Sequence, residues 1–512
     1  MSSSCCWSCF SKLRPSPSLP LRGAFRLPVR QPTTTTATSA FHTSSILNAL
    51  PAKKSKSQEA GPKYRESRAT RVVRKTKANK HLRRTPDERK AISHRIILTN
   101  NNALEVPSLR ELSASNLSEN ALKGEVVALP GTLQDQLKAV QAFKRSQGWS
   151  FFRRPCVLMR EETIELAQLM GELEGGAAEE KKERSASMNL VTGDRGTGKS
   201  VHLLQAAAMA FLKNWVVVTI PDAIDQVNGT TAYAPIPNSD PPKYFQKDST
   251  AQLLKRIVDG SGNVLDKLHI SQHHAFLKQH GISLLELAMM GVNTPETSWQ
   301  IFLALWSELT ATGPSAEAKG IKPFTIRPPV LVTVDNIAHW MTISKYHSAE
   351  YQPIHAHELS LVDHFLSLLT QDSKTALPNG GMLLYATSTS NSLRLESFEL
   401  ARRQLVARNA GIKPGPPEYP MLYTKLDERV TALFDNAKEL RHQKLSGLPK
   451  DETRSLLEYY ARSGVLRQRV DQDLVGEKWA LAACGVVGEL ERLSTRLSAI
   501  PVPRVSPTLN VG

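Results

Sequence analysis

Four short runs of apolar, largely β-branched residues stand out along the chain. They occupy residues 188–192, 215–220, 329–334 and 380–386. Apart from Asn189, Thr192, Thr219 and Thr333, the residues at both sets of alternating positions in these runs are apolar. This is typical of strands buried on two faces in a parallel sheet. Each run is followed by glycine, proline or a polar residue, as expected where a strand ends in a loop.

Helical spacing fills the stretches between and around these runs. Apolar residues at positions 133, 137, 140 and 143 would share one helix face. Similar patterns predict helices over residues 161–173, 250–258, 265–279 and 299–309. Strands alternating with helices predict an α/β fold with a parallel sheet flanked by helices.

A glycine-rich turn follows the first apolar run. Gly193 and Gly198, with Lys199 and Ser200, fit G-x-x-x-x-G-K-[ST], the phosphate-binding loop of P-loop NTPases. Glycine permits the backbone N–H groups to turn inward around a polyphosphate, and the following helix adds its positive dipole end. The predicted nucleotide-binding residues are Gly193, Asp194, Arg195, Gly196, Thr197, Gly198, Lys199, Ser200 and Asp335.

Asp335 ends the third apolar run, which is the pattern of a Walker B strand. A carboxylate there lies beside the P-loop, so Ser200 and Asp335 are predicted to hold Mg²⁺ through the nucleotide. The next residue is Asn336, where P-loop ATPases of this layout usually carry a glutamate that orients water. An amide cannot act as a base. We therefore expect weak or absent GTP or ATP hydrolysis and name no catalytic residue, although Glu350 or Glu358 could substitute from a loop.

Two further polar stretches leave alternatives open. Residues 387–391 (Thr-Ser-Thr-Ser-Asn) stand either at the sensor position of strand-inserted P-loop ATPases or as the cap of the next helix. Residues 424–427 (Thr-Lys-Leu-Asp) match a guanine-reading element but lie far downstream, so we interpret the match as coincidence. The base of the nucleotide is not fixed by these residues.

The net positive charge is confined to the N-terminal part. Residues 1–100 carry 21 Lys/Arg and four acidic residues, and so account for the whole net charge of +17. Residues 1–58 contain no acid and are rich in Ser, Thr and spaced Arg, which is typical of a mitochondrial transit peptide. Residues 51–95 form a basic arm of the kind that contacts nucleic-acid phosphates or serves as a solvated linker. No apolar run is long enough for a membrane span.

Cysteine usage excludes a disulfide framework. Cys5, Cys6 and Cys9 fall in the leader and resemble a C-x-x-C ligand set, but no second pair or histidine lies near them. The predicted organisation is as follows: 1–48 transit peptide; 49–100 basic, largely disordered arm; 101–185 mostly helical region; 186–400 P-loop core; 401–512 mainly helical, lid-like domain.

Taken together, four segments resemble the death-associated protein three family, the P-loop protein of the mitochondrial small ribosomal subunit. They are residues 151–155 (Phe-Phe-Arg-Arg-Pro), the P-loop, residues 215–221 and residues 329–336, in that order. The resemblance spans about residues 130–490. It implies an AAA+-like core, a bound guanine nucleotide (GTP or GDP), a place in the head of the subunit, and contacts with ribosomal RNA and neighbouring ribosomal proteins.

The sequence therefore predicts a structural, nucleotide-binding component of the small mitoribosomal subunit, located in the mitochondrial matrix. GTP or GDP with Mg²⁺ is the expected ligand, and ATP is the alternative. Two rival functions remain: an active mitochondrial NTPase that remodels a partner, and a switch whose nucleotide state controls association.

Overall fold

A computed structural model describes residues 95–495, apart from 118, 176–184, 238, 275, 277–280, 314–323, 390–392, 394, 414–418 and 421–422. The predicted transit peptide, nearly all of the basic arm, and Ser390 and Asn391 lie outside the described residues. Within them, no helix is both long and apolar enough to cross a membrane.

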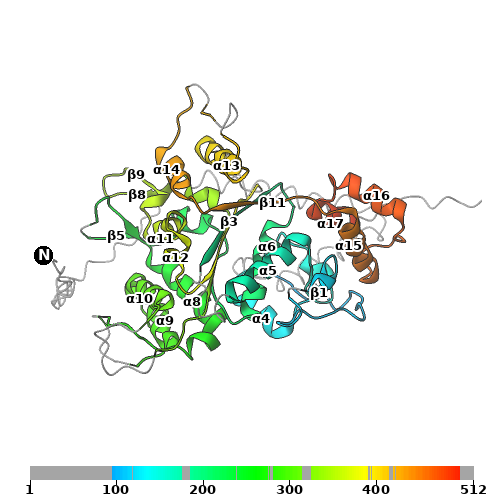
Figure 1. Ribbon diagram of the computed structural model, residues 1–512, viewed down its shortest axis with the longest axis horizontal. Helices are drawn as coiled ribbons and strands as arrows, with labels where there is room; N and C mark the ends of the chain where they lie inside the picture. The colour runs from blue at the N-terminus through cyan, green and yellow to red at the C-terminus, as the bar shows by residue number, and fades with distance from the viewer. Residues whose placement is uncertain are drawn as a thin grey trace, which may run out of the picture. The chain divides into compact units, whose positions relative to one another are not determined.

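A five-stranded parallel sheet organises the described part of the chain (Figure 1). Its order is β11 (Arg441–Leu445), β3 (Ala186–Gly193), β10 (Gly381–Ala386), β7 (Val330–Asp335) and β4 (Val216–Ile220). β10 is inserted between the P-loop strand β3 and β7, so the carboxyl ends of all three meet at one edge. The order confirms the predicted α/β fold with a strand-inserted P-loop core.

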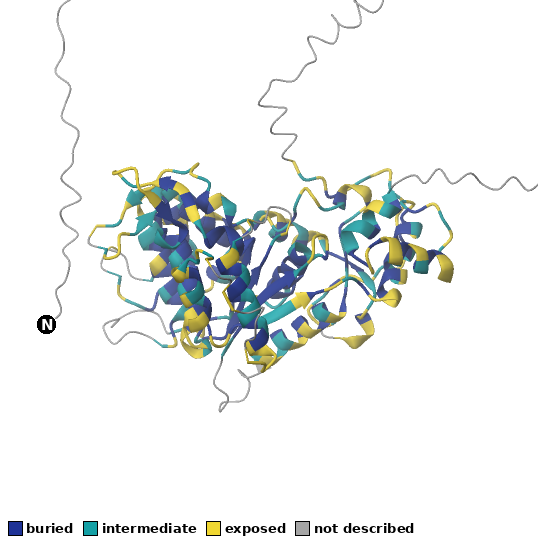
Figure 2. Ribbon diagram, turned by 90° about the horizontal axis from the view of Figure 1, so that it is seen from above, coloured by how far each residue is buried: buried dark blue, intermediate teal, exposed yellow. Residues whose placement is uncertain are grey.

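Strands β3, β10, β7 and β4 are buried on both faces because their side chains alternate between two cores. In β7, Val330, Val332 and Val334 join one core, while Leu331 joins the other. The strands are accordingly dark blue in Figure 2. The apolar runs of the sequence reflect this double burial.

Two groups of helices supply the cores. One face of the sheet packs on α4 (Gly131–Ala139), α5 (Glu161–Gly175) and α6 (Lys199–Leu212). The other packs on α8 (Lys247–Leu265), α9 (Leu284–Asn293), α10 (Ser298–Thr310), α11 (Ser360–Thr370), α12 (Ser373–Ala376), α13 (Glu396–Asn409) and α14 (Glu428–Asn436). A short helix α7 (Ile224–Val227) follows β4.

A third core joins segments of residues 106–158 to the C-terminal helices. Helices α15 (Lys450–Arg462), α16 (Gln472–Leu481) and α17 (Val487–Thr495) pack beside the antiparallel pair β1 (Val126–Ala128) and β2 (Cys156–Leu158) (Figure 1). Phe152 stacks on Tyr460 at 5.4 Å between ring centroids. Two further antiparallel pairs complete the description: β5 (Ala234–Pro235) with β6 (Tyr244–Phe245), and β8 (Ile343–His347) with β9 (Pro353–His355).

Several elements differ from the prediction. The helix expected over residues 265–279 is wrong, since α8 ends at Leu265 and the next helix begins at Leu284. Ser283 caps α9 in a capping box with Glu286, which fixes that start. Strand β11 was not predicted. Its residues Arg-His-Gln-Lys-Leu are mostly polar, and only Leu445 is buried, so no apolar run marks the strand.

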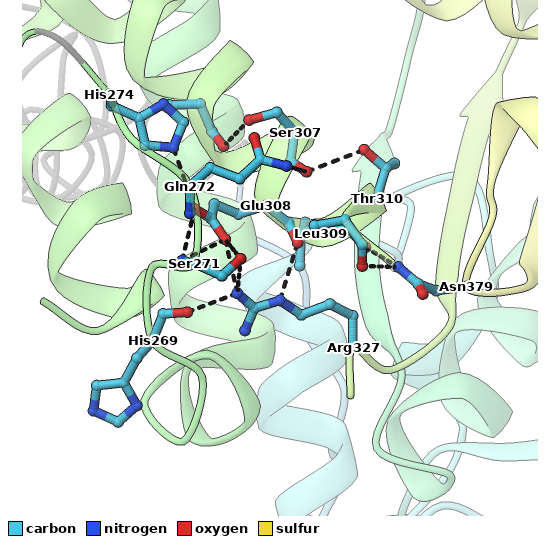
Figure 3. Close-up of polar contacts among 12 residues, drawn as sticks. His269, Ser271, Gln272, His274, Ser307, Glu308, Leu309, Thr310, Arg327 and Asn379 are labelled. Atoms are coloured by element: carbon cyan, nitrogen blue, oxygen red, sulfur yellow. Dashed lines mark hydrogen bonds and ion pairs between the residues drawn. The ribbon is translucent and has the colours of Figure 1, made fainter. Parts of the chain in front are cut away.

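A buried ion pair connects the segment before β7 to α10 (Figure 3). Arg327, which precedes β7, donates from Nη2 to Glu308 Oε2 on α10 at 2.7 Å, and their side chains are 1% and 0% exposed. Burial raises the pKa of Glu308, but hydrogen bonds from His274, Ser271 and Gln272 outweigh it and lower the pKa overall. The carboxylate is therefore held in its charged form.

Acid should destabilise the fold through His364 of α11. Its ring packs between aromatic neighbours, with centroids 4.9 Å from Trp306 and 5.2 Å from Phe302, and burial lowers its pKa from 6.5 to about 4. The unfolded chain therefore binds a proton below pH 6.5 that the folded chain refuses until about pH 4. Stability is fully present above pH 6.5 and is lost as the pH falls toward 4.

Replacing His364 by phenylalanine should reduce this loss of unfolding free energy by up to about 3 kcal/mol. Urea unfolding of both proteins across that pH range measures the difference. His347→Phe, at an exposed position, is the control and should leave the pH dependence as in the wild type. Equal pH dependence in His364→Phe and the wild type would contradict the assignment.

Candidate functional site

The P-loop forms between β3 and α6, as the motif predicts. Gly193 has a φ of +155° and Gly198 one of +98°, conformations that favour glycine. A Cβ on Gly193 would also lie 2.4 Å from the backbone oxygen of Leu445 on β11. The loop can therefore close against β11 only without a side chain at Gly193.

Lys199 folds back over this loop. Its Nζ donates to the carbonyls of Gly193 and Asp194 at 2.7 and 2.8 Å, and only 7% of the residue is exposed. Burial lowers the pKa of Lys199, while Asp335 and Asp194 oppose the shift. The ammonium is thus already placed at the mouth of the loop, where a phosphate would offer charged acceptors in place of carbonyls.

Ser200 and Asp335 meet although they lie 135 residues apart. The Ser200 hydroxyl donates to Asp335 Oδ2 at 2.6 Å, and Asp335 is 4% exposed. Lys144 makes a second contact with the same carboxylate oxygen. These oxygen donors fit Mg²⁺, which takes carboxylate and hydroxyl ligands beside nucleotide phosphates.

Asn336 does not face the P-loop. It adopts a left-handed conformation with φ +68°, and its Nδ2 donates to Asp222 Oδ1 at 3.1 Å, at the end of β4. The two glutamates considered as substitutes lie elsewhere: Glu350 is exposed, and Glu358 pairs with Arg429 at 2.8 Å. None of the three lines the cavity beside the P-loop.

Two contacts fasten the outer side of the loop. Arg160 is 7% exposed and donates to the carbonyl of Thr197 at 2.7 Å and to that of Ser446 at 2.9 Å. The backbone N–H of Gly488, in the first turn of α17, donates to the carbonyl of Gly196 at 2.9 Å. Sequence reasoning missed both, because neither residue belongs to a local motif.

A cavity of about 330 Å³ opens beside the loop and reaches the third core. This volume falls within the range of small-molecule sites, about 300–1,000 Å³. Its lining joins Arg195, Gly196, Gly198, Lys199, Ser200 and Asp335 to the aromatic side chains of Trp149, Phe152, Tyr459 and Tyr460. The other predicted residues act behind this surface: Asp194 offers its carbonyl to Lys199 and to the buried Thr197 hydroxyl.

Two polar side chains line the aromatic end of the cavity. Gln147 accepts the indole N–H of Trp149 at 2.6 Å, and its Nε2 has no partner among the described residues. Glu491 of α17 is half-buried, which raises its pKa, while a hydrogen bond from the backbone of Gly148 opposes the shift. No motif in the sequence marked these two residues.

The remaining candidates divide between the cavity and other places. Thr387, Ser388 and Thr389 line the cavity, so the sensor interpretation stays a prediction. The alternative, a cap of the next helix, is wrong, since α13 begins after Leu395. Asp427 caps α14 and pairs with His355 at 3.1 Å, away from the P-loop. Among the residues that the structure describes, no group of three His, Cys, Asp or Glu side chains could hold a metal ion.

Comparisons with known proteins place the chain. The family model for mitochondrial ribosomal death-associated protein 3 matches residues 157–493. The small ribosomal subunit protein mS29 of Neurospora crassa is 40% identical over 412 residues, covering 80% of this chain and 82% of that protein. A solved structure, Drosophila ORC bound to DNA, matches 65% of this chain and 59% of its own at 15% identity and a TM-score of 0.26, and it supports no conclusion here.

Proposed function

Because the chain belongs to the mitochondrial ribosomal death-associated protein 3 family, we propose that it is a structural component of the mitochondrial small ribosomal subunit. Its place of work would be the mitochondrial matrix, and its partners would be ribosomal RNA and neighbouring ribosomal proteins. The similarity to mS29 over four fifths of both chains carries this proposal.

Within that role, the chain would bind a nucleotide in the cavity beside the P-loop. The phosphates would lie against the backbone of residues 193–198, at the N-terminus of α6, and would receive Lys199 in place of the two carbonyls that now hold it. Bound Mg²⁺ would neutralise phosphate charge, and Ser200 and Asp335 are the residues that would hold it.

Guanine is the base that the aromatic end of the cavity favours. Guanine presents two N–H donors on one edge, and the Glu491 carboxylate, although burial raises its pKa, can accept both in its ionised form. Adenine presents an acceptor nitrogen at the corresponding edge and would leave Glu491 without that pair. The free Nε2 of Gln147 is a donor for a base carbonyl, and Trp149 and Phe152 offer apolar surface to the ring.

The nucleotide would act as a structural ligand that holds parts of the fold together, rather than as a substrate for hydrolysis. It would touch the P-loop, the segment around Trp149, and helices α15 and α17, which come from three separate parts of the chain. A ligand that binds only the folded state stabilises it by mass action. Hydrolysis would be weak or absent, since Asn336 is turned toward Asp222 and no glutamate after Asp335 orients water.

Sedimentation of mitochondrial extract tests the ribosomal role. The chain should travel with the small subunit, and a chain that stays at the top of the gradient would refute the proposal.

Purified protein with Mg²⁺ and GTP should turn over well below about one per minute, against about 10 s⁻¹ for a typical enzyme. Brisk turnover that Lys199→Ala abolishes would favour the NTPase alternative instead.

The basic arm, residues 51–95, would add contacts with RNA phosphates. The same gradients run in rising salt test it. Deletion of the arm should release the chain from the subunit at lower salt, because fewer phosphate contacts remain. Unchanged release would leave the arm a linker.

A further inference from the structure

Lys144 is a charged residue of the site that no motif includes. It follows α4 in a loop that passes beneath the P-loop helix, and its Nζ contacts Asp335 Oδ2. The Lys144 side chain is 27% exposed and that of Asp335 only 5%. The Walker B carboxylate therefore has a cation of the chain itself as its partner.

The same oxygen also accepts the Ser200 hydroxyl at 2.6 Å. Ser200 and Asp335 are the two groups that a P-loop protein offers to Mg²⁺. Here they contact each other, and Asp335 also contacts the ammonium of Lys144. A charge that the metal would supply is already present.

The direction from which Lys144 arrives matters. Asp335 and Ser200 line the 330 Å³ cavity, and they also line a second, smaller cavity of about 20 Å³ on their other side. Lys144 lines the small cavity and not the large one, together with Gln141 and Thr219. Lys144 therefore reaches the carboxylate without occupying the space proposed for phosphates.

The small cavity leaves little room for a metal ion beside the lysine. A space of that size holds about one water. Mg²⁺ keeps several waters of its octahedral shell when it binds proteins. With Lys144 in place, a hydrated ion therefore does not fit in this cavity. An ion on the nucleotide side would face the ammonium across Asp335.

We propose that Lys144 is a built-in counter-ion, which neutralises Asp335 so that the nucleotide binds with little dependence on Mg²⁺. A carboxylate without a cation would repel the phosphates, strongly so at a site shielded from water. This inference rests on the proposed nucleotide site. It goes beyond that proposal by assigning to a lysine the charge that P-loop proteins take from the metal.

Equilibrium binding of GDP to the full chain, in Mg²⁺ and in EDTA, tests the inference. The affinity of the wild type should differ less than about threefold between the buffers, while Lys144→Gln should bind about tenfold more weakly in EDTA and recover in Mg²⁺. Lys144→Arg keeps the charge and should behave as the wild type. Arg145→Gln removes the same charge from the neighbouring exposed residue and should change neither affinity.

The outcomes are distinct. A wild type that loses more than about tenfold in affinity in EDTA would overturn the inference without any variant, and would leave the nucleotide site standing. Equal dependence on Mg²⁺ in Lys144→Gln and the wild type would overturn it as well. Absence of GDP binding in both buffers would refute the nucleotide site itself, and the inference with it.

Discussion

Replacing Arg327 by methionine is expected to lower the free energy of unfolding by about 3–5 kcal/mol, because it leaves a buried carboxylate without its cation. Glu308 has no exposed side-chain surface, so water cannot take the place of the guanidinium. Removal of one partner of a buried pair is costly even where the pair itself adds little net stability.

The loss would extend beyond the ion pair (Figure 3). Arg327 also donates to the backbone carbonyls of Glu308 at 3.0 Å and His269 at 2.6 Å. The segment leading into β7 is thereby tied to α10 and to the loop after α8. Methionine has similar length but no donors, so these carbonyls would also lose the hydrogen bonds from Arg327.

Denaturant unfolding of the purified chain measures this effect. Arg454→Met is the matched control, since Arg454 pairs with Glu458 in α15 with a 53% exposed side chain. We expect that control to change stability by less than about 1 kcal/mol. Combining Arg327→Met with Glu308→Leu should recover part of the loss, and a single-variant loss as small as the control's would show that the pair is not buried.

Replacing Lys199 by alanine is expected to weaken GTP binding by about 10- to 100-fold. Lys199 is the cation at the mouth of the P-loop, and a hydrogen bond to a charged group contributes about 1.5–3 kcal/mol. The stability of the nucleotide-free protein should fall by less than the GTP-binding energy does, since Lys199 without nucleotide bonds only to the carbonyls of Gly193 and Asp194. The shift in melting temperature on adding GTP should therefore shrink.

Calorimetric titration with GTP measures the affinity directly. Lys255→Ala removes the same charge from an exposed position on α8 and should bind GTP as the wild type does. Wild-type affinity in Lys199→Ala would contradict the assignment of the P-loop. Loss of binding in both variants would point to general damage instead.

The strands of the sheet could be read from the sequence because burial on two faces writes a continuous apolar run. This holds for β3, β4, β7 and β10. It fails for β11, in which only Leu445 is buried and the polar residues resemble a loop. The helix predicted over residues 265–279 failed for another reason: its backbone N–H groups at Ser271 and Gln272 bond to Glu308, which lies more than 30 residues away.

By itself, the sequence determined the phosphate loop, the acidic residue that ends β7 and the α/β class, since each depends on neighbouring residues or on a regular period. Only the tertiary structure decided what surrounds the loop. Lys144 at Asp335, Arg160 at Thr197 and Glu491 in the cavity come from segments that are distant in the chain. Side chains brought together in this way leave no local pattern, because their partners are chosen by packing rather than by spacing.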